Sequence, residues 1–102
     1  MSTYSVTIAL VDDDGRTYDE DDVLACVDYF AALHGADIFA ATAGIGTDTD
    51  TGEREPITVI QGSVPSHSAD DLRDALASYA STHLHQRAIG WFATTEETYH
   101  VC

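Results

Sequence analysis

The sequence contains no lysine and only four arginines, against 18 aspartate and glutamate residues, which gives a net charge of −14 over 102 residues. The four cations stand at positions 16, 54, 73 and 87, too far apart in the sequence to predict a basic stripe. Because the net field also repels phosphate, direct binding of DNA or RNA is not expected.

Cysteine and long apolar runs are scarce as well. Cys26 and Cys102 are too few for a disulfide framework. No apolar run approaches the length of a membrane span, and the N-terminus lacks the basic segment that opens a signal peptide. Phosphate loop, nucleophile elbow, zinc-protease helix and dinucleotide fingerprint are absent from the sequence. We therefore expect a soluble intracellular protein, or a virion component if the chain is viral.

The acidity that is present has two interpretations. Repulsion at this charge density destabilises a fold at low salt and is screened at high salt. The composition accordingly resembles that of proteins from salt-loving archaea or their viruses. The alternative is a nucleic-acid mimic, in which carboxylates replace phosphates and capture a basic protein partner.

The residue pattern predicts six elements. Apolar and polar residues alternate over residues 4–11, which is typical of a strand. A capping box from Thr17 to Glu20 opens a helix predicted over residues 19–34, and Gly35 closes it. Residues 38–43 and 56–61 read as two strands joined by a polar, glycine-rich tip. Because proline donates no ladder hydrogen bond, Pro56 is expected as the first residue of its strand.

The second half of the chain repeats the alternation of helix and strand. A second capping-box-like start at Ser68 precedes a helix predicted over residues 69–83. A strand is predicted over residues 86–95, and residues 98–102 could add a short fifth one. The order β-α-β-β-α-β predicts a single α+β domain over residues 1–102, a ferredoxin-like sandwich with a four-stranded antiparallel sheet and both helices on one face.

The second face of such a sheet is uncovered in a monomer. Strands 4–11 and 86–95 carry apolar residues on both sides. We therefore predict a homodimer or larger homo-oligomer through the open sheet face.

Several loose motifs carry a family resemblance. They are Gly44-Ile-Gly46, Gly52, Glu53 through Val59, Ala75 to Tyr79, Gln86 and Ala88-Ile89. This pattern, over about the last two-thirds of the chain, resembles small βαββαβ domains of unknown function, although Thr47 stands where an aromatic residue is expected. The resemblance implies the fold and supplies no activity.

Metal sites and cofactors are not expected. His83, His85, His100 and Cys102 could offer nitrogen and sulfur ligands to zinc, but their spacing matches no zinc finger. Asp48, Asp50 and Gly52 share part of the spacing of a calcium loop, in which a third aspartate is missing here. Three adjacent aspartates at residues 12–14 are interpreted as a charged turn that closes a strand.

A small cofactor-free enzyme with a pocket between sheet and helices is one alternative function. The candidate side chains for proton transfer there are Tyr29, Tyr79, His34, His83, Trp91 and Glu55. Aromatic residues at helical or strand spacing are, however, more often core residues with a polar tip at the rim.

The function favoured by the sequence is a small, acidic, salt-adapted and self-associating binding or assembly domain without catalytic residues. The candidate contact residues for a protein partner are Asp48, Asp50, Glu53, Arg54, Glu55 and Trp91. An inhibitor from a virus or mobile element that mimics nucleic acid is the first alternative, and the cofactor-free enzyme is the second.

Overall fold

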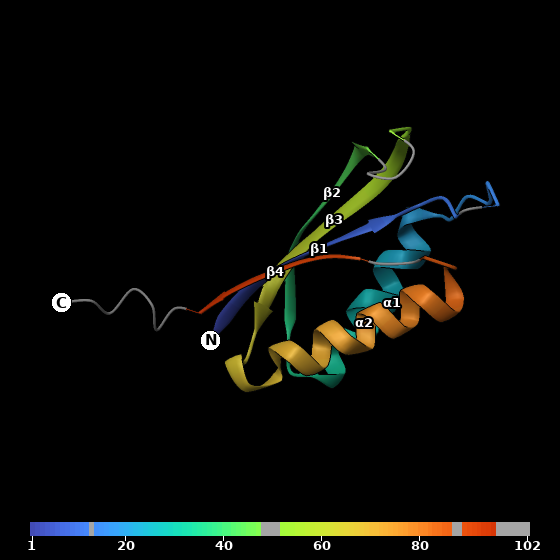
Figure 1. Cartoon of the computed structure of the whole chain (residues 1–102). Coiled ribbons are helices and arrows are strands. Elements are labelled where there is room, and N and C mark those ends of the chain that lie inside the picture. The colour runs from blue at the N-terminus through green and yellow to red at the C-terminus, as the bar shows by residue number, and fades with distance from the viewer. Residues whose placement is uncertain (13, 48–51, 87–88, 96–102) are drawn as a thin grey trace.

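The computed structural model describes residues 1–12, 14–47, 52–86 and 89–95. Its elements in chain order are β1 (Ser2–Ala9), α1 (Glu20–Leu33), β2 (Asp37–Thr47), β3 (Arg54–Val64), the short 3₁₀ helix η1 (Ser66–Ser68), α2 (Ala69–His83) and β4 (Gly90–Thr95). Both helices lie against one face of the sheet (Figure 1). The possible strand over residues 98–102 falls outside the described residues.

The sheet has the strand order β2-β3-β1-β4, and every neighbouring pair is antiparallel. Helix α1 connects β1 to β2 and leaves room for β3 between them, while α2 connects β3 to β4 around β1. These two interleaved split βαβ units confirm the predicted α+β, ferredoxin-like architecture. Among the described residues, neither helix is long and apolar enough to cross a membrane.

The core forms where alternate strand residues meet one stripe of each helix. Every second residue of β1 is buried, as the period-two pattern predicts. The buried aliphatic residues opposite them come from β3 and from both helices. They are Ile60 and Val64 of β3, Val23, Val27 and Ala31 of α1, and Leu72, Leu76 and Ala80 of α2.

Helix α1 begins differently from the prediction. The N-cap is Asp19, whose carboxylate accepts the backbone N–H of Asp21 at 2.8 Å. Thr17 does not cap the helix, because it lies in an isolated antiparallel bridge with Val11. The end of the helix is as predicted: Gly35 has a φ of 69°, and the next N–H, from Ala36, bonds to the carbonyl of Ala31.

The β2–β3 hairpin is longer than the sequence predicts. β3 begins at Arg54, so Pro56 is its third residue and not its first. The carbonyl of Pro56 accepts the N–H of Leu10, just beyond the last β1–β3 pair at Ala9 and Ile57. Because the N and C=O of one strand residue point to the same side, the N–H that proline lacks would face the carbonyl of Leu10. That carbonyl accepts the N–H of Tyr18 instead, so it is not left unpaired.

One tyrosine connects all four strands on the helix side of the sheet. Tyr4 of β1 pairs with Gly62 of β3, and its hydroxyl donates to the Asp37 carbonyl of β2 at 3.2 Å. Its ring also stacks on Trp91 of β4, with ring centroids 5.5 Å apart and planes 11° apart. Trp91 therefore lies on the helix side, and Phe92, which is 66 % exposed, lies on the open side.

Burial of Tyr4 predicts a loss of stability at alkaline pH. Burial first, and then the negative charges of Asp28 and Asp37, raise the pKa of Tyr4 to about 12. The folded state keeps the phenol proton after the unfolded state has lost it, so this stabilisation is present below about pH 10 and is lost as the pH rises toward 12. Between pH 9 and 11, urea unfolding should show wild type losing about 1 kcal/mol more than Tyr4→Phe. If the free energy of unfolding changed equally with pH in the two proteins, this prediction would be wrong.

Candidate functional site

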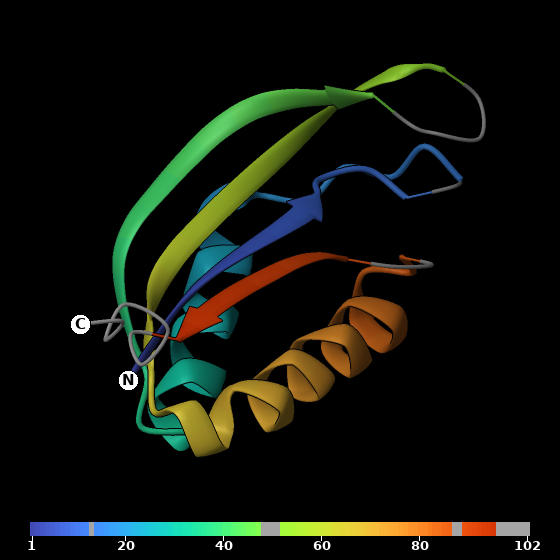
Figure 2. The same cartoon turned by 60° about the vertical axis from the view of Figure 1, so that its left-hand side comes forward.

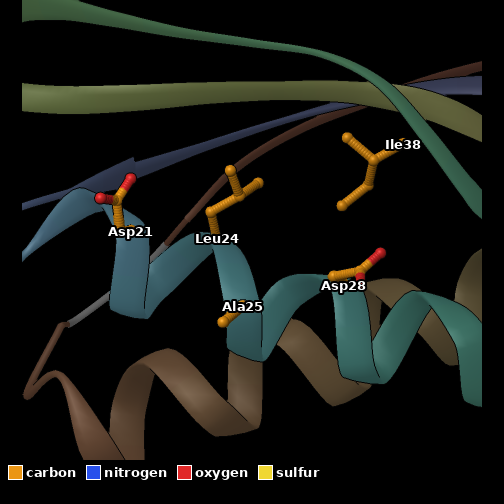
Figure 3. Close-up of a pocket in the computed structure, with 5 residues that line it drawn as sticks. All are labelled: Asp21, Leu24, Ala25, Asp28 and Ile38. Carbon is orange, nitrogen blue, oxygen red and sulfur yellow. The ribbon is translucent and has the colours of Figure 1, made fainter.

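A pocket opens between α1 and the start of β2. Its volume is about 390 Å³, and its lining residues are Asp21, Leu24, Ala25, Asp28 and Ile38 (Figure 3). Four of the five come from α1, and Ile38 faces them from β2. The site therefore lies at the edge of the sandwich, between the helix layer and an edge strand.

The spacing of α1 places these side chains together. Residues 21, 24 and 28 follow helical spacing and share one side of the helix, next to the stripe that enters the core. Leu24 is half-buried, and both aspartates are exposed. Asp21 and Asp28 are two turns apart, so about 10 Å of helix axis separates them. A ligand in the pocket would meet an apolar centre between two carboxylates.

A β-bulge shapes the opposite wall. The pairing of β2 with β3 shifts register between Ile38 and Ala40, which leaves Phe39 64 % exposed while Ile38 stays half-buried. Bulges bend a strand and redirect its side chains. Here the bulge lets Ile38 face α1 across the pocket (Figure 3).

The pocket is electrostatically negative. Its five lining residues include two carboxylates and no cation. The negative charge of Asp28 is also felt by the buried phenol of Tyr4, which it helps to keep protonated. The arrangement suits a ligand that carries positive charge beside an apolar group, since opposite charges attract and the apolar centre excludes water.

A second polar pair lies at the start of α1. Thr58 of β3 is fully buried, and its hydroxyl donates to Oε1 of Glu20 at 3.4 Å. Sequence reasoning assigned Glu20 to a capping box and missed this contact with the sheet. Glu20 precedes Asp21 in α1, so the contact between Thr58 and Glu20 holds the N-terminal end of the helix, which carries Asp21, against β3.

The buried carboxylate of Asp12 has a structural role. Its Oδ1 accepts the N–H groups of Asp14 and Arg16, and its Oδ2 accepts the hydroxyl of Tyr18. Burial alone would raise the pKa of this carboxyl, but these three bonds hold it below its usual value. The charged turn predicted for residues 12–14 is therefore seen at its described positions.

The side chains predicted for proton transfer do not converge. Tyr29 is exposed on α1, whereas Tyr79 is buried on α2, and burial followed by the nearby thiol of Cys26 raises the pKa of its phenol. His34 is held at the end of α1 by a 2.8 Å bond from Nδ1 to the carbonyl of Phe30. His83 lies exposed at the end of α2, and Glu55 lies on the hairpin. Sequence reasoning missed both pocket aspartates. It treated Asp21 as part of the acidic first turn of α1, and it assigned no role to Asp28 in the middle of the helix.

The contact and metal candidates are also spread out. Asp48, Asp50, His100 and Cys102 fall outside the described residues. Glu53 and Arg54 are exposed where the tip enters β3, whereas Trp91 faces the helices and is half-buried. Within the described ranges, no group of three or more histidine, cysteine, aspartate or glutamate residues could hold a metal ion.

The fold is similar to that of a known enzyme. No family model and no curated protein matches the chain. A solved structure of a phage SAM lyase in complex with S-methyl-5'-thioadenosine superimposes with a TM-score of 0.63 and 16 % identity, over 91 % of this chain and 79 % of that one. A phage SAM lyase in the apo state gives a TM-score of 0.68 and 16 % identity, over 91 % and 78 % of the two chains.

These matches correct the function predicted from the sequence. The prediction of a binding or assembly domain without catalytic activity is wrong, because the solved structures that share the fold are those of an enzyme. The expectation that the chain is not an enzyme is overturned with it. The sequence alone pointed away from an enzyme because it contains no known catalytic motif. The pocket forms from residues far apart in the sequence, when α1 packs beside β2. What the matches establish for this chain is its fold.

Proposed function

We propose that the chain is a small cofactor-free enzyme that cleaves S-adenosylmethionine and releases S-methyl-5'-thioadenosine from the pocket between α1 and β2. The observation that carries this proposal is the pair of carboxylates, Asp21 and Asp28, around the apolar centre formed by Leu24 and Ile38. The fold shared with a phage SAM lyase supports it.

The substrate matches the pocket in charge and polarity. S-adenosylmethionine carries a positive sulfonium, a positive ammonium and one carboxylate, and it joins them to a flat adenine ring. Asp21 and Asp28 attract the two positive groups, and Leu24 and Ile38 provide apolar surface. A net charge of −14 also raises the local concentration of a cationic substrate.

The product identifies the bond that breaks. S-methyl-5'-thioadenosine keeps both the methyl and the adenosyl group on sulfur, so the bond from sulfur to the four-carbon chain is cleaved. Its electron pair stays on sulfur, which becomes a neutral thioether. In a lyase reaction the four-carbon fragment then closes on its own carboxylate or loses a proton, and water does not enter the products.

The loss of charge on sulfur assigns a role to the aspartates. A carboxylate beside the sulfonium stabilises the ground state more than the transition state, in which the positive charge is already fading. Asp21 and Asp28 therefore serve substrate binding. The apolar centre between them favours the neutral thioether over the sulfonium, because a charge is less stable in an apolar environment.

The test is direct conversion of the substrate. Purified protein is incubated with S-adenosylmethionine in water enriched in ¹⁸O, and the products are identified by mass spectrometry. We expect S-methyl-5'-thioadenosine together with a four-carbon product free of ¹⁸O. A four-carbon product with ¹⁸O in its hydroxyl group would indicate hydrolysis at the same site, whereas a lactone that opens afterwards takes up ¹⁸O in its carboxyl group. Release of S-methyl-5'-thioadenosine no faster than in buffer, from protein shown to be folded, would refute the proposal.

Salt adaptation is a further part of the proposal. With no lysine and 18 carboxylates, the fold should be stabilised as salt screens repulsion between exposed charges. Circular dichroism is expected to show a melting temperature that rises by more than 10 °C between 0.1 M and 3 M KCl, because many charges contribute together. Glucose at matched osmolality controls for solvent effects other than screening. An unchanged melting temperature would contradict this prediction.

A further inference from the structure

We propose that two copies of this chain pair through the free edges of their β2 strands, antiparallel about a two-fold axis, so that their sheets join into one. This inference is independent of the proposed catalytic activity. It rests on the position of β2, on the residues along it and on the register that a two-fold axis allows.

β2 is an edge strand with unusual exposure. It lies at the end of the strand order, and its ladder bonds go to β3 alone. Its outer part, residues 41–45, is exposed on both faces, because the hairpin extends past the helix layer (Figure 2). Phe39 and Ile45 are 64 % and 72 % exposed. Much of this strand therefore has neither core contacts nor a second neighbour.

Most of the usual protections of an edge strand are missing from residues 40–47 of β2. Natural sheets block edge pairing with lysine, proline, inward charges, short strands or β-bulges, and of these β2 has only the bulge at Phe39, near its start. Residues 38–47 contain no charged residue and no proline, in a chain where 22 residues in 102 are charged. The other edge, β4, has six residues in Gly90–Thr95, compared with eleven in β2. Two copies of the chain repel each other through their net charge, and this repulsion is weakest along a strand without charged residues.

Symmetry restricts the register of such a pair. A two-fold axis perpendicular to the sheet places each face beside the same face of the copy, so residues opposite each other must come from one face. With the axis at Thr42, Ala43 lies opposite Ala41 of the partner. Gly44 then lies opposite Ala40 of the partner, and Ile45 reaches the bulge of the partner. The bulge at Phe39 ends the regular pairing.

Charges at the ends of β2 set the salt dependence. Antiparallel pairing brings the tip of one hairpin, with Glu53, Arg54 and Glu55, toward Asp37 and Asp28 of the other copy. These groups sum to a net negative charge, so they repel at low salt and are screened at high salt. Pairing of copies should therefore strengthen with salt. Binding of a basic peptide at the same edge would weaken with salt. The salt dependence therefore distinguishes a second copy of the chain from a basic peptide as the partner of β2.

Two matched variants locate the contact. Ala43→Glu places a carboxylate on the β2 edge, on the helix side and away from the open face. Gln61→Glu adds the same charge on the open face, where Gln61 is exposed and pairs with Ser5 and Ala40. Both positions are exposed, and circular dichroism verifies folding. Sedimentation equilibrium of each protein in 0.1 M and 3 M KCl then gives the association constant.

We expect wild type to be dimeric at 3 M KCl and to associate at least tenfold more weakly at 0.1 M. Ala43→Glu should weaken association at least tenfold at 3 M KCl, and Gln61→Glu should leave it within twofold of wild type. Folded wild-type protein that stays monomeric at 3 M KCl would overturn the proposal. So would a dimer broken by Gln61→Glu and not by Ala43→Glu, which would place the contact on the open face predicted from the sequence.

Discussion

Replacement of Asp28 by asparagine is expected to raise the KM for S-adenosylmethionine about tenfold, with kcat unchanged or slightly raised. The variant removes one of the two negative charges that line the pocket. A tenfold change corresponds to about 1.4 kcal/mol, within the range for one charge pair near a protein surface. Because the positive charge on sulfur disappears during the reaction, this loss affects the bound substrate more than the transition state. Steady-state release of S-methyl-5'-thioadenosine measures both constants.

The control for Asp28 lies on the same helix. Asp22→Asn removes the same charge from α1, but Asp22 does not line the pocket, and its charge acts on Tyr79 between the helices. It should leave KM within twofold of wild type. The double variant Asp21→Asn and Asp28→Asn should lower kcat/KM about 100-fold if the two contributions add. Equal effects of Asp22→Asn and Asp28→Asn would show that only net charge matters, and would remove the pocket from the proposal.

Gly62→Ala is expected to destabilise the fold by about 3 kcal/mol or more. A Cβ at Gly62 would overlap the carbonyl oxygen of Asp37, and it would lie 2.7 Å from the hydroxyl and 2.8 Å from the ring of Tyr4. The first of these groups is backbone, so the clash cannot be relieved by a side-chain rotation. Either β2 separates from β3 near the bulge, or Tyr4 leaves the core. Urea unfolding followed by circular dichroism measures the loss.

Gly44→Ala is the matched control in the same hairpin. A Cβ there meets only Cγ1 of Ile57, at 3.8 Å, which is an ordinary contact. Its midpoint of unfolding should stay close to that of wild type or increase, since alanine restricts the unfolded chain. If Gly62→Ala were as stable as Gly44→Ala, the arrangement of Tyr4 over Gly62 would be wrong.

The periodic parts of the fold could be predicted from the sequence. The helix predicted over residues 69–83 coincides with α2, and the one predicted over 19–34 differs from α1 by one residue at each end. Both have apolar residues at helical spacing and acidic first turns, so local and tertiary preferences agree. The antiparallel sheet followed from the order of elements.

The hairpin and the pocket could not be predicted in the same way. β2 continues through Gly44 and Gly46, residues that weaken a strand by propensity, because pairing with β3 supplies the hydrogen bonds that propensity ignores. Asp21 and Asp28 sit on a helix side that periodicity marks as solvent-facing. Their meeting with Ile38 depends on the bulge at Phe39, and nothing in the local sequence specifies that bulge.

The stack of Trp91 on Tyr4 gives this protein an intrinsic spectroscopic probe. Trp91 is the sole tryptophan of the chain, so its emission comes from one place, the contact between β4 and β1. Two aromatic rings at this separation should couple in the near-ultraviolet circular dichroism spectrum, and the signal should vanish when β4 leaves the sheet. Because β4 is the edge strand beside β1, this band reports its addition to the sheet, whereas far-ultraviolet signals report mainly the helices. Comparing their kinetics during refolding would order the two events without any label.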